Sequence, residues 1–199
     1  MNNTGIIILA AGSSSRFGNT KQLAYFKGKT LLKHTTEEAA EAGAQPVLVV
    51  TGANADEISN EIKNEKVEIV FNKDWEQGMA SGIVMGLRTA IILNKDVEKV
   101  IITVCDQPFV SSSLFQQLFQ RQNESGKHIV ASAYANTIGT PALFTIKYFD
   151  ALMGLTGDHG AKGMLKKYSD DLVTVDFPDG YIDIDTQQDY ENLLKRNPG

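Results

Sequence analysis

The chain has 199 residues, of which 42% are hydrophobic and 22% are charged, a balance typical of globular proteins and not of disordered ones. Its 24 acidic and 19 basic residues give a net charge of -5, which argues against a nucleic-acid-binding protein because those are usually basic. The apolar runs are shorter than the ~20 residues of a membrane-spanning helix. One cysteine, Cys105, and no signal-like start fit a reducing compartment. We therefore expect a cytoplasmic protein that binds neither nucleic acid nor membrane.

Short apolar runs alternate with segments of helical periodicity along the chain. In chain order, the pattern predicts a strand over residues 5–11, a helix over 31–42, a strand over 46–51, a helix over 55–63, a strand over 67–71, a helix over 81–93, a strand over 100–104, a helix over 111–122, strands over 129–133 and 142–145, a helix over 161–168, a strand over 172–175 and a helix over 187–195. Residues 136–160 are less periodic, and we expect them to form a flap or subdomain.

The predicted strands are apolar on both faces and are separated by helices, which indicates a sheet covered by helices on both sides. The fold class is therefore α/β, a three-layer α/β/α arrangement with a Rossmann-like, mostly parallel sheet. No linker is evident, so we expect residues 1–199 to form a single domain. Sheets of this kind bind ligands beyond the carboxyl ends of their strands, so the residues that follow each apolar run are the candidate site.

The segment after the first predicted strand, residues 11–21, is rich in glycine and serine and carries Arg16 and Lys21. Its glycine spacing matches neither the dinucleotide-binding fingerprint nor the Walker A loop. Small residues nevertheless let backbone N–H groups approach a phosphate closely, and the two cations add charge. The alternative is a surface turn with two solvated cations.

Two further segments place carboxylates at strand ends. Asp106 follows the strand over 100–104, where a carboxylate suits a Mg²⁺ site. The alternative, that Asp106 caps local backbone, is weakened because Ser111 and Ser112 are better placed to cap the next helix. Near the C-terminus, Thr186 and Asp189 resemble a capping box, which leaves Asp185, or its neighbour Asp183, free as a second metal ligand.

Two glycine-bounded loops precede helices. Residues 78–81 can open a helix whose free N–H groups face a ligand, unless Ser81 is simply the N-cap. Trp75, just before them, can stack on a base or pack in a half-buried position. The loop over residues 157–162 contains His159, which is either a substrate contact or a surface residue.

These segments together resemble a known family. Residues 9–21 resemble the signature loop of nucleotidyltransferases with the nucleotide-diphospho-sugar transferase fold, and the ordered set that follows is similar to the molybdenum cofactor cytidylyltransferase branch, also called molybdopterin nucleotidyltransferase-like. The set comprises Asn72, Trp75 and Gly78-Met79, then Cys105-Asp106-Gln107-Pro108, Gly139-Thr140-Pro141-Ala142-Leu143-Phe144, Gly157-Asp158-His159-Gly160-Ala161-Lys162 and Asp183-Ile184-Asp185-Thr186. The resemblance spans nearly the whole chain.

The resemblance implies transfer of a nucleoside monophosphate from an NTP to the phosphate of a molybdopterin cofactor, with release of pyrophosphate. It implies Mg²⁺ as cofactor, held by Asp106 and Asp185, and catalytic roles for Arg16, Lys21 and Asp106. The implied nucleotide-binding residues are Leu9, Ala10, Ala11, Gly12, Ser13, Ser14, Arg16, Gly18, Lys21, Gly78, Met79, Ser81 and Asp106. The implied acceptor-binding residues are Thr140, Pro141, Asp158, His159 and Gly160.

Departures from the family pattern bear on the nucleotide. The guanylyl branch usually begins with Gly-Gly and carries Asp before its lysine, whereas this chain has Ala11-Gly12 and Thr20-Lys21. We therefore expect CTP to be favoured over GTP, and a molybdoenzyme to be the partner that receives the product. Two alternatives stay open: a nucleotidyltransferase for another phosphorylated acceptor such as a sugar phosphate, and a non-catalytic chaperone that inserts the molybdenum cofactor.

Overall fold

The computed structural model describes residues 3–14, 16–158 and 160–196. Within them the main sheet has seven strands in the order β5-β4-β1-β6-β8-β7-β9. Its strands are β1 (Thr4–Leu9), β4 (Val47–Thr51), β5 (Glu68–Phe71), β6 (Lys99–Val104), β7 (Ile129–Tyr134), β8 (Thr137–Thr145) and β9 (Leu172–Asp176). Every neighbouring pair is parallel except the two pairs that include β8. This confirms the predicted α/β fold with a mostly parallel sheet.

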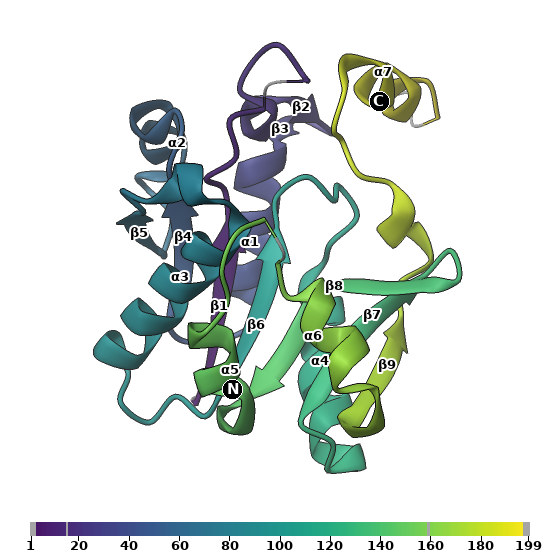
Figure 1. Ribbon diagram of the computed structural model, residues 1–199. Helices are drawn as coiled ribbons and strands as arrows, with labels where there is room; N and C mark the ends of the chain where they lie inside the picture. The colour runs from purple at the N-terminus through teal and green to yellow at the C-terminus, as the bar shows by residue number, and fades with distance from the viewer. Residues whose placement is uncertain (1–2, 15, 159, 197–199) are drawn as a thin grey trace.

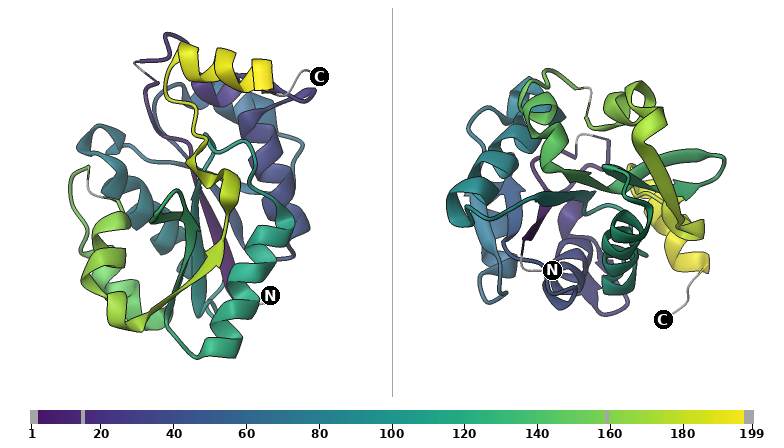
Figure 2. Two further views of the ribbon diagram at one scale, coloured as in Figure 1. Left: turned by 90° about the vertical axis from the view of Figure 1, so that its right-hand side faces the viewer. Right: turned by 90° about the horizontal axis from the view of Figure 1, so that it is seen from below.

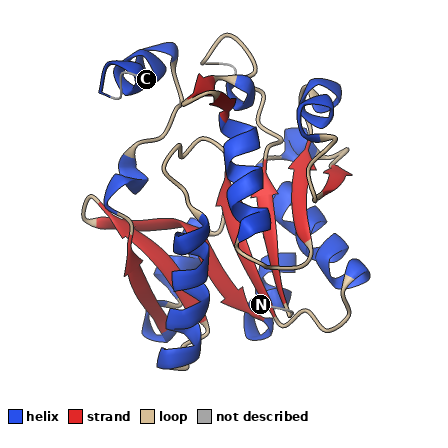
Figure 3. Ribbon diagram, turned by 180° about the vertical axis from the view of Figure 1, so that it is seen from behind, coloured by secondary structure: helices blue, strands red, loops and turns tan. Residues whose placement is uncertain are grey.

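Helices cover both faces of this sheet, as the three layers in Figure 2 show. Figure 1 looks onto the face covered by α3, α5 and α6, and Figure 3 looks from behind onto α1, α2 and α4. The helices are α1 (Leu31–Glu41), α2 (Ala55–Ile62), α3 (Met79–Leu93), α4 (Ser112–Ser125), α5 (Phe149–Met153), α6 (Lys162–Lys167) and α7 (Gln187–Arg196). None of the helices in the described ranges is long and apolar enough to cross a membrane.

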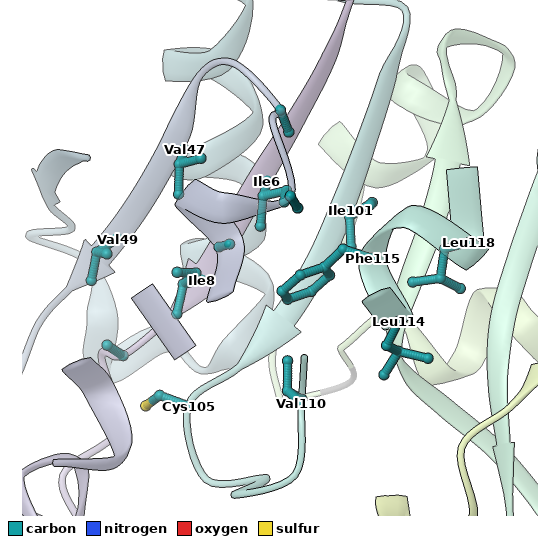
Figure 4. Close-up of a cluster of buried hydrophobic side chains, with 14 of the residues drawn as sticks. Ile6, Ile8, Val47, Val49, Ile101, Cys105, Val110, Leu114, Phe115 and Leu118 are labelled. Atoms are coloured by element: carbon teal, nitrogen blue, oxygen red, sulfur yellow. The ribbon is translucent and has the colours of Figure 1, made fainter. Parts of the chain in front are cut away.

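The two layers of the core follow from the alternation of side chains along each strand. Ile6 and Ile8 of β1 face α1, α2 and α4, whereas Ile7 between them faces α3. On the first side, Phe115 and Leu118 of α4 pack against Ile101 of β6 (Figure 4). Because both faces are buried, the strands read in the sequence as continuous apolar runs.

The segment over residues 136–160 differs from the expected flap. Thr137–Thr145 is β8, which lies inside the main sheet between β6 and β7. Its pairing register with β7 skips Thr140 and Pro141 at a bulge, and its pairing with β6 begins only at Ala142. Proline is tolerated in a strand at such an irregularity because its missing N–H is not needed there. Gly139 and Pro141 therefore interrupt the sequence pattern without ending the strand.

The segment that follows β1 and the C-terminal helix α7 meet beyond the carboxyl ends of β1 and β6. The short hairpin of β2 (Tyr25–Phe26) and β3 (Lys29–Thr30), which the sequence pattern did not predict, lies beside α7 (Figure 1). The hydroxyl of Tyr190 on α7 donates to the carbonyl of Tyr25 at 2.7 Å. The same helix places the ring of Tyr190 edge-on to Phe17 in the loop after β1.

Helix α3 packs unusually close to the sheet, and Gly86 permits this approach. A Cβ atom at Gly86 would lie 2.5 Å from Cγ2 of Ile7 and 3.1 Å from Cγ2 of Val50. Both neighbours are β-branched side chains held in the buried sheet, so they have little freedom to move. A larger residue at this position must push the helix off the sheet.

We predict that Gly86→Ala destabilises the protein by about 1–3 kcal/mol through overpacking, although alanine favours helices. Gly163 is the matched control, because it is also helical and a Cβ there would meet nothing within 4 Å. Gly163→Ala should leave stability unchanged or raise it by up to about 1 kcal/mol. Urea unfolding of both variants measures the difference, and equal midpoints would show that the approach of α3 is not limiting.

Candidate active site beyond strands β1 and β6

The candidate site lies where the order of the sheet reverses. From β1 the chain goes to β4 on one side, and β6 later joins β1 on the other side, so the two carboxyl ends border a crevice of the kind that binds ligands in open α/β sheets. A cavity of about 420 Å³ lies there. It is lined by Leu9, Ala11, Gly12, Ser13, Lys21, Gln22, Trp75, Glu76, Gly78, Met79, Gly82, Val104, Cys105, Asp106 and Asp158. Thus residues from loops far apart in sequence meet in one cavity.

The loop after β1 is held in shape by a side chain that the sequence analysis did not single out as functional. Gln22 is 2% exposed and donates to the carbonyls of Ala10 and Gly12. Ser14 has a left-handed backbone (φ 55°), and its hydroxyl donates to Gln22 Oε1 and accepts from the N–H of Lys21. These hydrogen bonds hold the backbone of the loop at Ala10, Gly12, Ser14 and Lys21, although Gly12, Ser13 and Arg16 are exposed.

The two cations of this loop have different surroundings. Lys21 points into the cavity, whereas Arg16 is exposed and forms no ion pair with any residue in the described ranges. Gly18 and Ser14 line a second, more open cavity on the other side of the loop, together with Tyr190 of α7. Consequently the structure brings Lys21, but not Arg16, into contact with the predicted carboxylates.

Lys21 lies between Asp106 and Asp185. Its Nζ is 2.7 Å from Asp106 Oδ2 and 2.8 Å from Asp185 Oδ1. Burial by itself would lower the pKa of Lys21, but the charges and hydrogen bonds of the two aspartates outweigh it and raise the pKa above its ordinary value. Lys21 is thus a permanently charged ammonium held by two carboxylates.

Backbone contacts bring the C-terminal segment to Asp106. The N–H of Ile184 donates to the carbonyl of Asp106 at 3.0 Å, and the Ile184 side chain is fully buried against the loop after β1. Asp185 therefore faces Lys21 directly. The carboxyl group of Asp183 is affected by the same charges. Its pKa is raised, first by partial burial and then by the negative charges of Asp185 and Asp106.

The helix start that follows this segment confirms the predicted capping box. The N–H of Thr186 donates to Asp189 Oδ2, and the N–H of Asp189 donates to the Thr186 hydroxyl. Hydrogen bonds from Thr186 lower the pKa of Asp189. The carboxylate of Asp189 is therefore used in the helix cap, whereas that of Asp185 contacts Lys21.

The opposite wall of the cavity is formed by the start of α3 and by Asp158. Gly78 (φ 98°) is the N-cap of α3, which begins at Met79, two residues earlier than predicted, and a Cβ at Gly78 would collide with Asp158 and Gly157. The N–H of Ala80 donates to the carbonyl of Gly157. Gly160 is buried against Met79, and His159 lies outside the described residues.

Ser81 lies inside a helix, whereas Trp75 lines the cavity. Ser81 is not the N-cap: it lies inside α3, where its hydroxyl accepts from Asn72 and donates to the carbonyl of Gly78. Trp75 is half-buried and lines the cavity, and a Cβ at Gly52 would lie 2.5 Å from its Cβ. Gly52 thus makes the space that the indole occupies.

The two residues of β8 expected to contact the acceptor do not line this cavity. Pro141 is buried, and its carbonyl accepts from the Ser132 hydroxyl at 2.7 Å. The Thr140 hydroxyl lies 3.4 Å from Gln107 Oε1, and Gln107 in turn donates to the carbonyl of Gly180. Thr140 therefore contacts the residue next to Asp106 and not Asp158.

Cys105 is inert in this structure. The residue is 3% exposed and its thiol lies 3.7 Å from the carbonyl of Leu9. Burial, followed by the nearby charge of Asp106, raises the pKa of Cys105 to about 12. A thiol that stays protonated at neutral pH is a poor nucleophile, which agrees with its interpretation as a small packing residue beside Asp106.

Comparison with known proteins places this site in a wider context. The family model described as the MobA-like NTP transferase domain matches residues 6–172. That range includes the loop after β1, Asp106 and the loop over residues 157–160, whereas Asp185 lies beyond it.

Single proteins are similar over nearly their whole length. The nicotine blue oxidoreductase of Paenarthrobacter nicotinovorans is 28% identical over an alignment 199 positions long. The alignment covers 94% of this chain and 95% of that protein. The crystal structure of the Rv0371c homologue from Mycobacterium sp. strain JC1 has a TM-score of 0.83 at 26% identity and covers 98% of this chain and 96% of its own. Rv0371c from Mycobacterium tuberculosis H37Rv, in complex with manganese, has a TM-score of 0.73 at 24% identity and covers 97% and 98%.

Proposed function

The chain belongs to the MobA-like NTP transferase domain family, and from this premise we propose that it transfers CMP from CTP to the phosphate of a molybdopterin-type cofactor. The observation that carries the proposal is the contact of Lys21 with both Asp106 and Asp185, beside a cavity that Lys21 and Asp106 line together with the glycine-rich loop. An anion-binding loop and a carboxylate pair are the two components that nucleotidyl transfer requires. We also propose that residues 1–199 act as one domain, with a molybdoenzyme as the recipient of the product.

The donors at the site fit a divalent metal ion. Asp106 and Asp185 offer hard carboxylate oxygens that converge within 2.8 Å of one cation, the ammonium of Lys21. Mg²⁺ typically binds through one or two carboxylates and takes its other ligands from water and substrate phosphates. We propose that these two residues hold Mg²⁺, and the manganese complex of Rv0371c supports a divalent ion in this fold. When bound, the ion would neutralise negative charge on the nucleotide phosphates.

The chain's own residues account for the remaining chemistry. An oxygen of the acceptor phosphate attacks the α-phosphorus of CTP, the bond to the bridging oxygen breaks, and pyrophosphate leaves with that oxygen. The attacking phosphate is already ionised, so positioning and charge stabilisation suffice without a strong base. We propose that Lys21 and Arg16 stabilise the leaving pyrophosphate. The backbone N–H groups of the loop would hold its oxygens.

The remaining walls of the cavity suggest where the base and the acceptor bind. Trp75, Gly78 and Met79 line the same cavity. We propose that the base lies there. We propose that the acceptor binds near Asp158, which lines the same cavity, and near Gly160. Thr140, which lies beside Gln107, would contact the acceptor from β8.

A pyrophosphate-release assay tests the proposal. CTP, GTP, ATP and UTP are each incubated with the protein, with and without molybdopterin cofactor, in the presence of Mg²⁺. We expect pyrophosphate release with CTP that depends on the cofactor. Turnover on a sugar phosphate but not on molybdopterin would favour a different acceptor, and tight cofactor binding without pyrophosphate release would favour an insertion chaperone.

Substitution of the two proposed charged groups should abolish most activity. We predict that Asp106→Ala and Arg16→Ala each lower kcat by about 100-fold or more while the protein stays folded, because the first removes a proposed ligand of Mg²⁺ and the second removes a cation that stabilises the leaving pyrophosphate. Arg121→Ala on α4, also an exposed arginine, is the control and should retain activity. Wild-type turnover of Asp106→Ala, with an unchanged circular dichroism spectrum, would contradict the metal-ligand role.

Replacement of Lys21 should change the affinity for metal and the affinity for nucleotide in opposite directions. Its ammonium neutralises Asp106 and Asp185, so Lys21→Met should strengthen Mn²⁺ binding without nucleotide by about tenfold and weaken CTP binding. Electron paramagnetic resonance titration with Mn²⁺ measures the first effect. Lys29→Met, which breaks the ion pair of Lys29 with Glu37 elsewhere, should change neither affinity. Weaker Mn²⁺ binding by Lys21→Met would rule out competition between ammonium and metal.

A further inference from the structure

Gln22 is a buried polar residue, and its side-chain amide makes its hydrogen bonds to the loop after β1. It follows Lys21 directly and is 2% exposed. Its Nε2 donates to the carbonyl of Gly12 at 2.9 Å and to that of Ala10 at 3.2 Å, and its Oε1 accepts from the Ser14 hydroxyl at 2.9 Å. Both amide hydrogens and the amide oxygen are therefore used within one loop.

These contacts fix the direction of two peptide groups. In a planar trans peptide, the carbonyl of one residue and the N–H of the next point in opposite directions. Because the carbonyls of Ala10 and Gly12 point toward Gln22, the N–H groups of Ala11 and Ser13 point away from it. Ala11, Gly12 and Ser13 line the cavity that also contains Lys21 and Asp106. Within the described ranges, neither N–H donates to a protein acceptor.

The same network extends to Lys21. The Ser14 hydroxyl that donates to Gln22 also accepts from the backbone N–H of Lys21 at 3.2 Å. Thus one side chain links the direction of the loop amides to the position of the lysine whose ammonium meets Asp106 at 2.7 Å. Backbone N–H groups and a nearby cation together make an anion site.

We propose that Gln22 is a positioning residue that presets this loop for the pyrophosphate portion of the nucleotide. The inference rests on the proposed function, since that reaction provides the pyrophosphate. Gln22 touches no substrate in this role: it acts by keeping two amide N–H groups and Lys21 directed at the same anion. A residue that only fills the core would support folding without affecting anion affinity.

Gln22→Leu tests this role, because leucine fills a similar volume but donates nothing to the carbonyls of Ala10 and Gly12. Gln22→Glu is the second variant, because it keeps the acceptor for Ser14 and loses the amide donors. The control is Gln122→Leu: Gln122 is also buried, at 8% exposure, and its Nε2 donates to the carbonyl of Lys127 far from the cavity. All three variants lose a buried side-chain amide donor to backbone, so the comparison separates local from general destabilisation.

Binding of inorganic pyrophosphate with Mg²⁺ is measured by calorimetry, and thermal stability is measured in parallel. Trp75, the one tryptophan of the chain, lines the cavity and gives an independent fluorescence signal for CTP binding. We expect pyrophosphate to bind Gln22→Leu and Gln22→Glu at least about tenfold more weakly than wild type, in line with the loss of preset hydrogen bonds. Gln122→Leu should lose stability but keep wild-type affinity. The KM for CTP should rise more than kcat falls.

Should both Gln22 variants fail to fold, Ser14→Ala removes the hydroxyl link at a partly exposed position and is expected to weaken pyrophosphate binding by a smaller factor. Pyrophosphate affinity equal to wild type in a folded Gln22 variant, or in Ser14→Ala if those do not fold, would overturn the positioning role and leave the proposed function intact. Failure of the wild-type protein to bind either pyrophosphate or CTP would overturn both.

Discussion

β1 and β6 run in parallel over six residue pairs, from Thr4 opposite Lys99 to Leu9 opposite Val104, and their carboxyl ends therefore stop at the same level. The pairing is enforced by burial of both faces, because slipping one strand by a residue would exchange its two apolar faces between the two helical layers. The loop that carries Lys21 and the turn that carries Asp106 leave the sheet side by side as a consequence. The rest of the site is assembled around this pair of strand ends.

Local charge, and not net charge, determines what this crevice can hold. The protein is acidic overall, yet the loop after β1 collects an ammonium, an exposed guanidinium and inward-turned carbonyls in a short segment. Lys21 offsets two carboxylates, which would otherwise repel each other as well as any phosphate. Partial burial, followed by the charges of Asp185 and Asp106, raises the pKa of Asp183 in the same segment. Under the proposed function, a nucleotide with its metal ion would replace one set of ion pairs with another without leaving a bare charge.

Close approach of backbone segments gives the cavity its shape. Gly52 leaves room for the indole of Trp75, and Gly78 leaves room for the loop that carries Asp158. Gly86 lets α3 pack closely against β1 and β4. In each case the absent side chain is replaced by a neighbour from a distant part of the chain.

The sequence by itself determined the α/β class, most of the strands and helices, and the capping box of α7, because these depend on local periodicity and on short-range hydrogen bonds. It also predicted Cys105 to be a packing residue, but the burial that raises the pKa of its thiol comes from the tertiary structure. It also pointed to Lys21, Asp106 and Asp185, first through the residue types in their segments and then through a family resemblance. Tertiary structure alone decided that β8 is an inner antiparallel strand, that Asp185 and not Asp183 contacts Lys21, that Arg16 stays exposed, and that Gln22 holds the loop. These features depend on contacts between residues remote in sequence, and no local pattern encodes which buried carbonyl a glutamine side chain will reach.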